Sequence, residues 1–168
     1  MTTESTERKI RILFVCLGNI CRSPMAESIF SKIIESKNQL NDFEIDSAGL
    51  INYHQGELAD SRMRSHGLKR GYTIRSRSRQ ITKQDLDYYD WILAMDNQNM
   101  EGLHRIATTP NQYGKFHLIT DFCEHNEANH VPDPYYGGEQ GFENVIDILE
   151  DACMGLFKSI NNAFQYPL

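Results

Sequence analysis

The chain has 168 residues, a length that suits one domain with a full-sized core, and its composition is that of an ordinary globular protein. Its formal net charge of -6 argues against a dedicated nucleic-acid binder, because such proteins carry an excess of positive charge. No apolar stretch approaches the roughly 20 residues that a membrane span needs. We therefore expect neither a nucleic-acid partner nor a membrane span.

The first residues differ in character from the rest of the chain. Residues 1–8 are polar and lack the apolar run of a secretory signal, so we expect a disordered N-terminal tail followed by a single domain over residues 9–168. Of the four cysteines, two lie within one short motif, and reduced thiols are the default in a chain without a secretory signal. This pattern favours a cytoplasmic location.

Short apolar runs alternate with helical patterns along the chain. Strands are predicted at residues 10–15, 43–47, 91–95 and 115–119, and helices from residue 23, over 58–68, near 84–88, over 97–107 and from residue 142 onward. Ser23 is expected to cap the first helix, with Pro24 at its first position. A long loop is predicted over residues 120–138. This alternation predicts an α/β fold in which helices flank a doubly wound parallel sheet.

Polar residues follow or end each predicted strand. Cys16 follows the first strand, Ser47 ends the second, Asp96 follows the third, and Asp133 lies in the loop after the fourth. Ligands of such folds bind beyond the carboxyl ends of the strands. We therefore expect these four residues to meet at one edge of the sheet.

Residues 16–22 read C-L-G-N-I-C-R and lie between a predicted strand and a predicted helix. A turn at this place can direct several backbone N–H groups into one concavity, and the helix N-terminus adds the positive end of its dipole. Arg22 can clamp phosphoryl oxygens in a bidentate manner. The same surroundings favour the thiolate form of Cys16. The motif predicts a phosphate-binding loop that contains a nucleophile.

The chemistry that follows is phosphoryl transfer. Attack by Cys16 on a phosphate monoester would form a cysteinyl-phosphate, and the leaving group would need a proton. Asp133, held between two prolines, is the best candidate for a general acid that then acts as a base for water. Ser23 can donate a hydrogen bond to the thiolate. The rings of Tyr135 and Tyr136 could form the wall of a pocket for an aromatic phosphoester.

The motifs V-C-L-G-N-I-C-R-S-P, D-S-A-G and D-P-Y-Y-G resemble those of the low-molecular-weight protein tyrosine phosphatases, in the family's order, from about residue 9 onward. The resemblance implies a flavodoxin-like three-layer sandwich with a four-stranded parallel sheet, no cofactor, and hydrolysis of phosphotyrosine in proteins. It also implies activity on small aryl phosphates, and inorganic phosphate as product and competitive inhibitor. By position, Cys16 is the nucleophile, Arg22 the clamp, Ser23 the partner of the thiolate, and Asp133 the general acid.

Further residues are assigned through the same resemblance. The phosphate would be bound by the loop residues Leu17, Gly18, Asn19, Ile20, Cys21 and Arg22. Asn19 would adopt a left-handed conformation and bond to Ser47. Tyr53 is implied as a pocket wall and His54 as a variable specificity position, while Ile20 fits the tyrosine-specific members, because related arginine phosphatases have Thr there. One departure is Ser76, which stands where many relatives have a His that braces the asparagine.

Two features of the cysteines stay open at this point. Cys21 either packs beneath the loop or forms a reversible disulfide with Cys16. Cys123, His125 and His130 lie close together in the sequence, but their irregular spacing and the lack of a clear fourth ligand argue against a metal site.

Two other functions compete with hydrolysis. An arsenate reductase would reuse the same loop but needs further cysteines for a thiol relay, and Cys123 and Cys153 are poorly placed to supply it. A non-catalytic phosphoprotein-binding module would need the loop but not the acid at Asp133.

Overall fold

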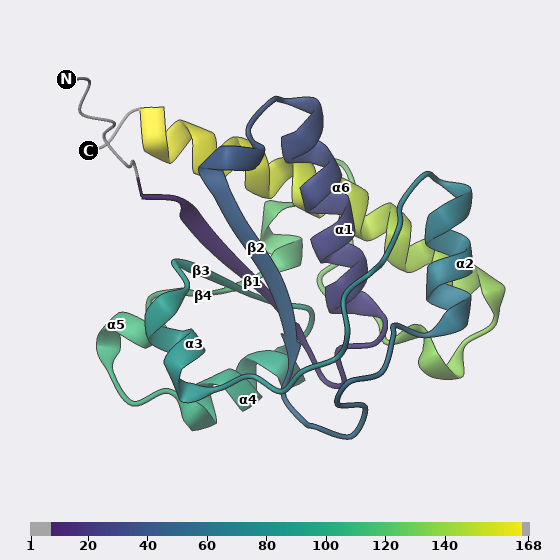
Figure 1. Cartoon of the computed structure of the whole chain (residues 1–168), viewed down its shortest axis with the longest axis horizontal. Coiled ribbons are helices and arrows are strands. Elements are labelled where there is room, and N and C mark those ends of the chain that lie inside the picture. The colour runs from purple at the N-terminus through teal and green to yellow at the C-terminus, as the bar shows by residue number, and fades with distance from the viewer. Residues whose placement is uncertain (1–7, 166–168) are drawn as a thin grey trace.

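The computed structural model describes residues 8–165 and contains a sheet of four parallel strands, which confirms the predicted α/β class (Figure 1). The strands are β1 (Ile10–Cys16), β2 (Phe43–Gly49), β3 (Trp91–Ala94) and β4 (Phe116–Leu118), in the order β2-β1-β3-β4. β1 therefore lies inside the sheet between β2 and β3, and its apolar run from Ile12 to Val15 is fully buried.

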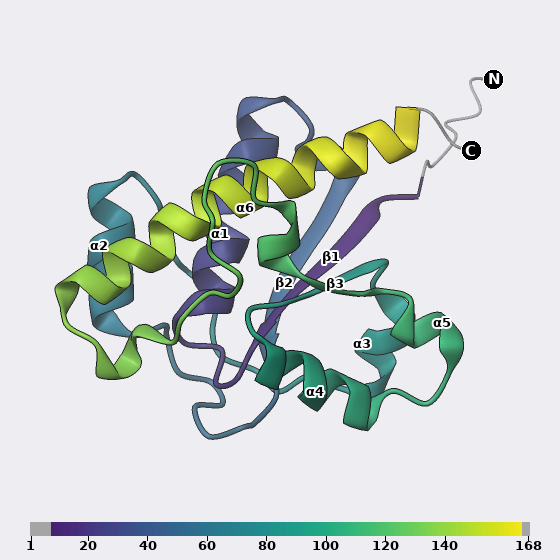
Figure 2. The ribbon, with the colours of Figure 1, turned by 180° about the vertical axis from the view of Figure 1, so that it is seen from behind.

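Helices cover both faces of this sheet. They are α1 (Arg22–Ser36), α2 (Ser61–Lys69), α3 (Lys83–Tyr88), α4 (Asn97–Ile106), α5 (Pro110–Tyr113) and α6 (Glu139–Gln165). Figure 1 shows α1 and α6 on one side of the strands and α3, α4 and α5 on the other, and Figure 2 shows the long α6 from behind. α2 packs against α6 beside α1.

Each face of the sheet has its own hydrophobic core. Phe14 on β1 points toward α1 and packs with Phe30, whose ring also contacts Phe43 and Phe157. Leu13, the next residue back along β1, belongs to the opposite core with the residues of α3 and α4. This alternation follows from the two-residue period of a strand.

The first helix begins one residue earlier than expected, and Ser23 does not cap it. Cys21 occupies the N-cap position without a side-chain bond, and Ser23 and Pro24 lie inside the first turn. The hydroxyl group of Ser23 is instead engaged by Cys16 and Asn19. Pro24 still costs no hydrogen bond, because the first four N–H groups of a helix have no partner within it.

Other differences also have a local cause. α2 begins at Ser61 rather than at residue 58, because the carboxylate of Asp60 accepts hydrogen bonds from the N–H groups of Arg62 and Met63. α5, which the sequence did not predict, is a short helix that begins with a capping box between Thr109 and Gln112. The predicted 120–138 loop contains two short 3-10 turns, Ile119–Phe122 and Pro134–Tyr136.

The predicted N-terminal tail lies outside the described residues, except for Arg8, whose guanidinium group pairs with Asp90 at 2.7 Å. Within residues 8–165, no helix combines the length and the apolar character that crossing a membrane requires.

A glycine allows α6 to approach the turn after β4. A Cβ atom at Gly155 would lie 1.7 Å from the carbonyl oxygen of Phe122. We expect Gly155→Ala to lower the free energy of unfolding by about 3 kcal/mol, because the helix must move away from a rigid backbone. Chemical denaturation measures this. The control is Gly141→Ala on the same helix, where the nearest atom is 3.8 Å away; equal stability of the two variants would contradict the prediction.

Candidate functional site

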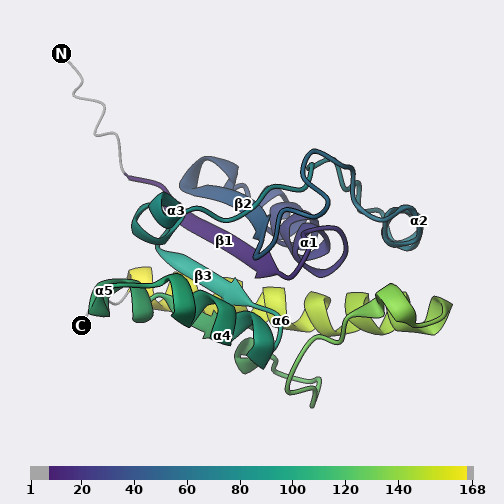
Figure 3. The same ribbon diagram turned by 90° about the horizontal axis from the view of Figure 1, so that it is seen from below.

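The candidate site lies where β1 ends and α1 begins. Figure 3 shows the arrowheads of β1 and β3 pointing toward the same end of the sheet. Cys16 is the last residue of β1, and Asp96 follows β3 as the N-cap of α4. Two of the four predicted polar positions therefore lie at this edge, and the contacts described below bring Ser47 and Asp133 to it.

The loop between β1 and α1 is held by its carbonyl oxygens. Five of them accept hydrogen bonds. The carbonyl oxygens of Cys16, Leu17, Ile20 and Cys21 accept from the N–H groups of Leu50, Ile51, Asp60 and Met25, respectively, and that of Gly18 accepts from the hydroxyl group of Ser78. These bonds turn the carbonyl groups outward. The opposite ends of the peptide units are left to point into the loop, as an anion-binding nest requires.

The N–H groups of residues 17–21 are the complement of this arrangement. Among residues 8–165 they have no hydrogen-bond acceptor. They lie at the N-terminus of α1, where the helix dipole also favours negative charge. The loop therefore offers a set of free donors in the place where a phosphate group was expected to bind.

The loop rests on the end of β2 through a close backbone contact. A Cβ atom at Gly49 would lie 2.9 Å from the carbonyl oxygen of Leu17 and 3.1 Å from the backbone nitrogen of Asn19. The absence of a side chain at Gly49 therefore lets the two segments touch.

Asn19 has φ = 57°, the left-handed conformation that was expected. Its buried side-chain amide group donates to Ser23 Oγ at 2.7 Å and to Ser47 Oγ at 3.0 Å. Its carbonyl oxygen accepts from the backbone N–H of Arg79 at 3.1 Å. The contact with Ser47 that the resemblance implied is therefore present, and a backbone group of Arg79 supplies a further brace on Asn19.

The thiol of Cys16 is paired with a hydroxyl group. Its sulfur lies 3.0 Å from Ser23 Oγ. Because Ser23 Oγ already accepts from Asn19, its own proton is free to point at the sulfur. Asn19 and Ser23 thus form a chain of donors that ends at Cys16.

The side chain of Arg22 is almost entirely buried. One terminal nitrogen donates to Asp96 at 2.6 Å and to the carbonyl oxygen of Val131 at 3.0 Å, and the other lies 3.8 Å from Asp133. Burial disfavours the charged form, but Cys16, Asp96 and Asp133 outweigh it and raise the pKa of Arg22. The guanidinium group is therefore permanently charged and fixed in orientation.

Asp133 reaches the loop from more than a hundred residues further along the chain. Its Oδ1 accepts a hydrogen bond from the N–H of Tyr135 at 3.0 Å, and its Oδ2 faces Arg22. Its side chain is 41% exposed, so water has access to the carboxyl group.

These groups surround a cavity of about 380 Å³. Its lining includes the predicted site residues Cys16, Leu17, Gly18, Ile20, Cys21, Arg22, Tyr53, His54, Asp133 and Tyr135. Tyr53 stands at the rim with 82% of its surface exposed, and His54 bonds to Glu57 at 2.7 Å. The side chain of Tyr136 lies outside the described part of the chain. Asn19 and Ser47 do not line the cavity and lie behind the loop.

The cysteines of the loop are unlinked. Cys16 and Cys21 are both free thiols, and burial, aided by Asp60 and Cys16, raises the pKa of Cys21. Within residues 8–165, no group of three or more His, Cys, Asp or Glu side chains is arranged to hold a metal ion.

For three residues, the sequence did not indicate the role that they play in the site. Ile51 lines the cavity, Ser78 holds the carbonyl oxygen of Gly18, and Asp96, expected at this edge without a role, holds Arg22. For Ile51 and Ser78, no periodicity or motif signals the contact, because each depends on where a long connection returns to the loop.

Known proteins are similar to this chain in sequence and in fold. A protein tyrosine phosphatase of Entamoeba histolytica is 45% identical with a TM-score of 0.90, over 92% of this chain and 99% of that one. The low molecular weight protein-tyrosine-phosphatase YfkJ of Bacillus subtilis is 38% identical over 93% of this chain and 99% of its own. A Drosophila arginine phosphatase is 32% identical with a TM-score of 0.84, over 90% of this chain and 98% of that one.

The family model described as low molecular weight phosphotyrosine protein phosphatase matches residues 11–166, nearly the whole of the chain. The match includes the loop, the helix that follows it and the distal aspartate. The chain belongs to the low molecular weight phosphotyrosine protein phosphatase family.

Proposed function

We propose that this enzyme hydrolyses phosphotyrosine monoesters in proteins through a cysteinyl-phosphate intermediate on Cys16. The observation that carries the proposal is the set of free N–H groups of residues 17–21, which share one loop with the thiol of Cys16 and the buried guanidinium group of Arg22. A phosphate dianion placed there would complete the hydrogen bonds of the loop.

In the first step, Cys16 Sγ attacks phosphorus, so that an S–P bond forms and the bond between phosphorus and the phenolic oxygen breaks. The N–H groups and Arg22 stabilise the charge on the equatorial oxygens. Asp133 gives its proton to the leaving phenolate. The carboxyl group is suited to this role because it lies in the same cavity as the sulfur and remains accessible to water.

In the second step, water attacks the phosphocysteine and Asp133 takes up its proton. The S–P bond breaks and inorganic phosphate forms, while the hydroxyl group of Ser23, 3.0 Å from the sulfur, stabilises the departing thiolate. Free phosphate fits the same loop, so we expect it to inhibit competitively.

The lining of the cavity favours an aryl phosphate. Ile20, Ile51 and the rings of Tyr53 and Tyr135 surround the entrance, so a phenyl ring would bury apolar surface there. An apolar side chain at Ile20 offers no hydrogen bond to a guanidinium group, which favours tyrosine over arginine as the phosphorylated residue. The same lining would accept small aryl phosphates.

The competing functions find less support. The thiols of Cys123 and Cys153 suit no relay of the kind an arsenate reductase needs, because burial raises the pKa of Cys123 to about 11 and Cys153 is fully buried in the core. A pure binding module has no use for Asp133 opposite the sulfur.

We assign the enzyme to the cytoplasm, since its four cysteines are free thiols.

Replacing the nucleophile tests the mechanism. We expect Cys16→Ser to abolish turnover of p-nitrophenyl phosphate, because a serine hydroxyl group in this loop remains protonated and attacks phosphorus poorly. Release of inorganic phosphate measures the effect, and binding of vanadate shows that the loop persists. Substantial residual turnover would contradict a phosphocysteine.

The role of Asp133 is tested by the leaving group. We expect Asp133→Ala to slow hydrolysis of phenyl phosphate by about 10²- to 10⁴-fold, the range for loss of general acid catalysis. The loss should shrink for p-nitrophenyl phosphate, whose phenolate leaves without a proton. An equal loss for both substrates, measured as kcat/KM, would exclude Asp133 as the acid.

The contact between β2 and the loop predicts a third effect. Gly49→Ala should lower the free energy of unfolding by about 1–3 kcal/mol and lower kcat/KM, because the new methyl group meets the backbone of Leu17 and Asn19. Gly138→Ala, which places its Cβ in open space, is the control. The prediction would be wrong if both variants retained full activity and stability.

A further inference from the structure

One carboxyl group behind the loop has no role in the steps above. Glu27 lies on α1, one turn after Ser23. Its Oε1 is inaccessible to water and has no hydrogen-bond partner among the described residues. The hydroxyl groups of Ser47 and Ser76 and the carboxylate of Asp46 lie close enough to the carboxyl group of Glu27 to affect its pKa. A buried carboxylate oxygen without a donor is unfavourable, and a second carboxylate beside it adds repulsion.

The surroundings of Glu27 contain little to stabilise a negative charge. Burial raises the pKa of Glu27 to about 7; the hydroxyl groups of Ser47 and Ser76 oppose this shift, and Asp46 adds to it. Arg79, which lies beside Asp46, forms its ion pairs with Asp46 at 3.0 Å and with Asp85 at 2.9 Å.

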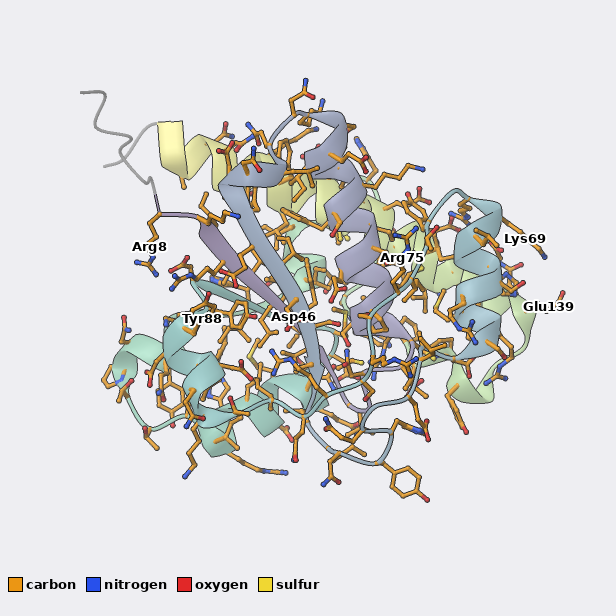
Figure 4. All side chains as sticks on the ribbon, viewed as in Figure 1. Arg8, Asp46, Lys69, Arg75, Tyr88 and Glu139 are labelled. Atoms are coloured by element: carbon orange, nitrogen blue, oxygen red, sulfur yellow. The ribbon has the colours of Figure 1, made fainter. Side chains whose placement is uncertain are left out.

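The remaining charged groups on the neighbouring segment lie at the surface. Arg75 and Arg77, on either side of Ser76, are both exposed. Figure 4 labels Asp46 on β2, the strand that packs against α1, and Arg75 on the segment that follows α2. The charge that acts most directly on Glu27 is therefore that of Asp46.

Glu27 is linked to the phosphate-binding loop through Ser47. Ser47 Oγ accepts the hydrogen bond from Asn19, so its own O–H must find another acceptor, and the carboxyl group of Glu27 is beside it. The backbone N–H of Ser47 in turn donates to Asp46 Oδ1 at 2.8 Å. Asp46 and Ser47 are consecutive residues of β2, so a group that contacts both fixes the strand at the point where it supports Asn19.

We propose that Glu27 is a positioning residue that shares a proton with Asp46, and that this proton joins α1 to β2 and holds Ser47 under Asn19. The O–H of the neutral carboxyl group donates to Asp46 and its C=O accepts from Ser47. This satisfies the buried oxygen and removes the repulsion between the two carboxylates. The role rests on the proposed function only for its effect on catalysis.

The proposal has a defined pH dependence. The fold favours the neutral form of Glu27, so burial of its charge weakens the fold as the pH rises from the ordinary value near 4.5 through about 7. Above pH 7 the two carboxylates repel each other, and the support for Asn19 loosens. Glu27→Gln keeps one donor and one acceptor at every pH and so imitates the neutral form.

The test is the ratio of kcat/KM between Glu27→Gln and the unchanged enzyme, measured from pH 5 to pH 8.5 with an aryl phosphate. Effects of pH on the substrate and on the catalytic steps are common to both proteins and cancel in the ratio. We expect the two kcat/KM values to be nearly equal at pH 5. At pH 8.5 we expect the value of the variant to be about fivefold higher, because a smaller fraction of the wild-type enzyme then holds the loop in its active conformation. The dependence on leaving group should be the same in both.

A matched control lies on the same strand. Glu44 is a half-exposed carboxylate of β2 that accepts from Tyr88 and pairs with Arg11. Glu44→Gln removes the same charge from the neighbourhood without touching Ser47, and its ratio should stay flat with pH. A flat ratio for Glu27→Gln, or an equal slope for Glu44→Gln, would overturn the proposal.

Two measurements do not depend on turnover. The melting temperature of Glu27→Gln minus that of the unchanged protein should increase from pH 5 to pH 8.5. Infrared spectra should show a protonated carboxyl group near neutral pH, and this signal should be lost in Glu27→Gln. The pH midpoint of the signal should fall in Asp46→Asn, a variant that replaces Glu27→Gln in the test if Glu27→Gln folds poorly. Absence of that signal at pH 6 would refute the shared proton. If the signal is present but the protein has no phosphatase activity, the proposed function is wrong and the shared proton is not.

Discussion

The hydrogen bonds that turn five of the carbonyl groups of residues 16–21 outward are the constraint on which the rest of the site depends. A short loop cannot present its N–H groups to one point unless the opposite ends of its peptide units are bonded elsewhere. Here four of the five partners come from three separate segments, after β2, before α2 and before α3, and the fifth is the N–H of Met25 on α1. The anion-binding property of the loop is thus a property of the whole carboxyl edge of the sheet.

This constraint explains several features around the loop. β2 extends to Gly49, and the N–H groups that follow it reach the carbonyl oxygens of Cys16 and Leu17. Gly49 has no side chain, which permits the approach. Asn19 adopts a left-handed conformation that most residues disfavour, and its side chain compensates with bonds to Ser23, Ser47 and Arg79.

Electrostatics determine the other side of the site. A guanidinium group as buried as that of Arg22 is tolerated only because Asp96 and the carbonyl oxygen of Val131 bind it. The segment with Val131 also bonds through its N–H to the carbonyl oxygen of Met95 at the end of β3. The same attachment brings Asp133, two residues later, within 3.8 Å of Arg22. One arginine therefore connects the loop, β3 and the segment that carries the carboxyl group.

The sequence was sufficient to predict the four strands, the main helices and the residues of the loop. A buried strand such as β1 is encoded by consecutive apolar residues, and the loop by a dense local motif. The ends of helices were less predictable, because a side chain can bond to more than one partner. Ser23 bonds to Cys16 and Asn19 instead of capping α1, and the cap at Asp60 makes α2 begin three residues later than predicted. Contacts from long connections, such as those of Ile51 and Ser78, carried no local signal.

The sequence by itself determined the order of the elements and the chemical types available at the ends of the strands, because both follow from local periodicity and motif. Only the tertiary structure decided which peptide units turn outward, how Arg22 is held, and that one oxygen of Glu27 is buried without a donor while its carboxyl group lies near Asp46. Each of these depends on groups that are distant in the chain. Their hydrogen bonds and burial arise only when the sheet brings the segments together.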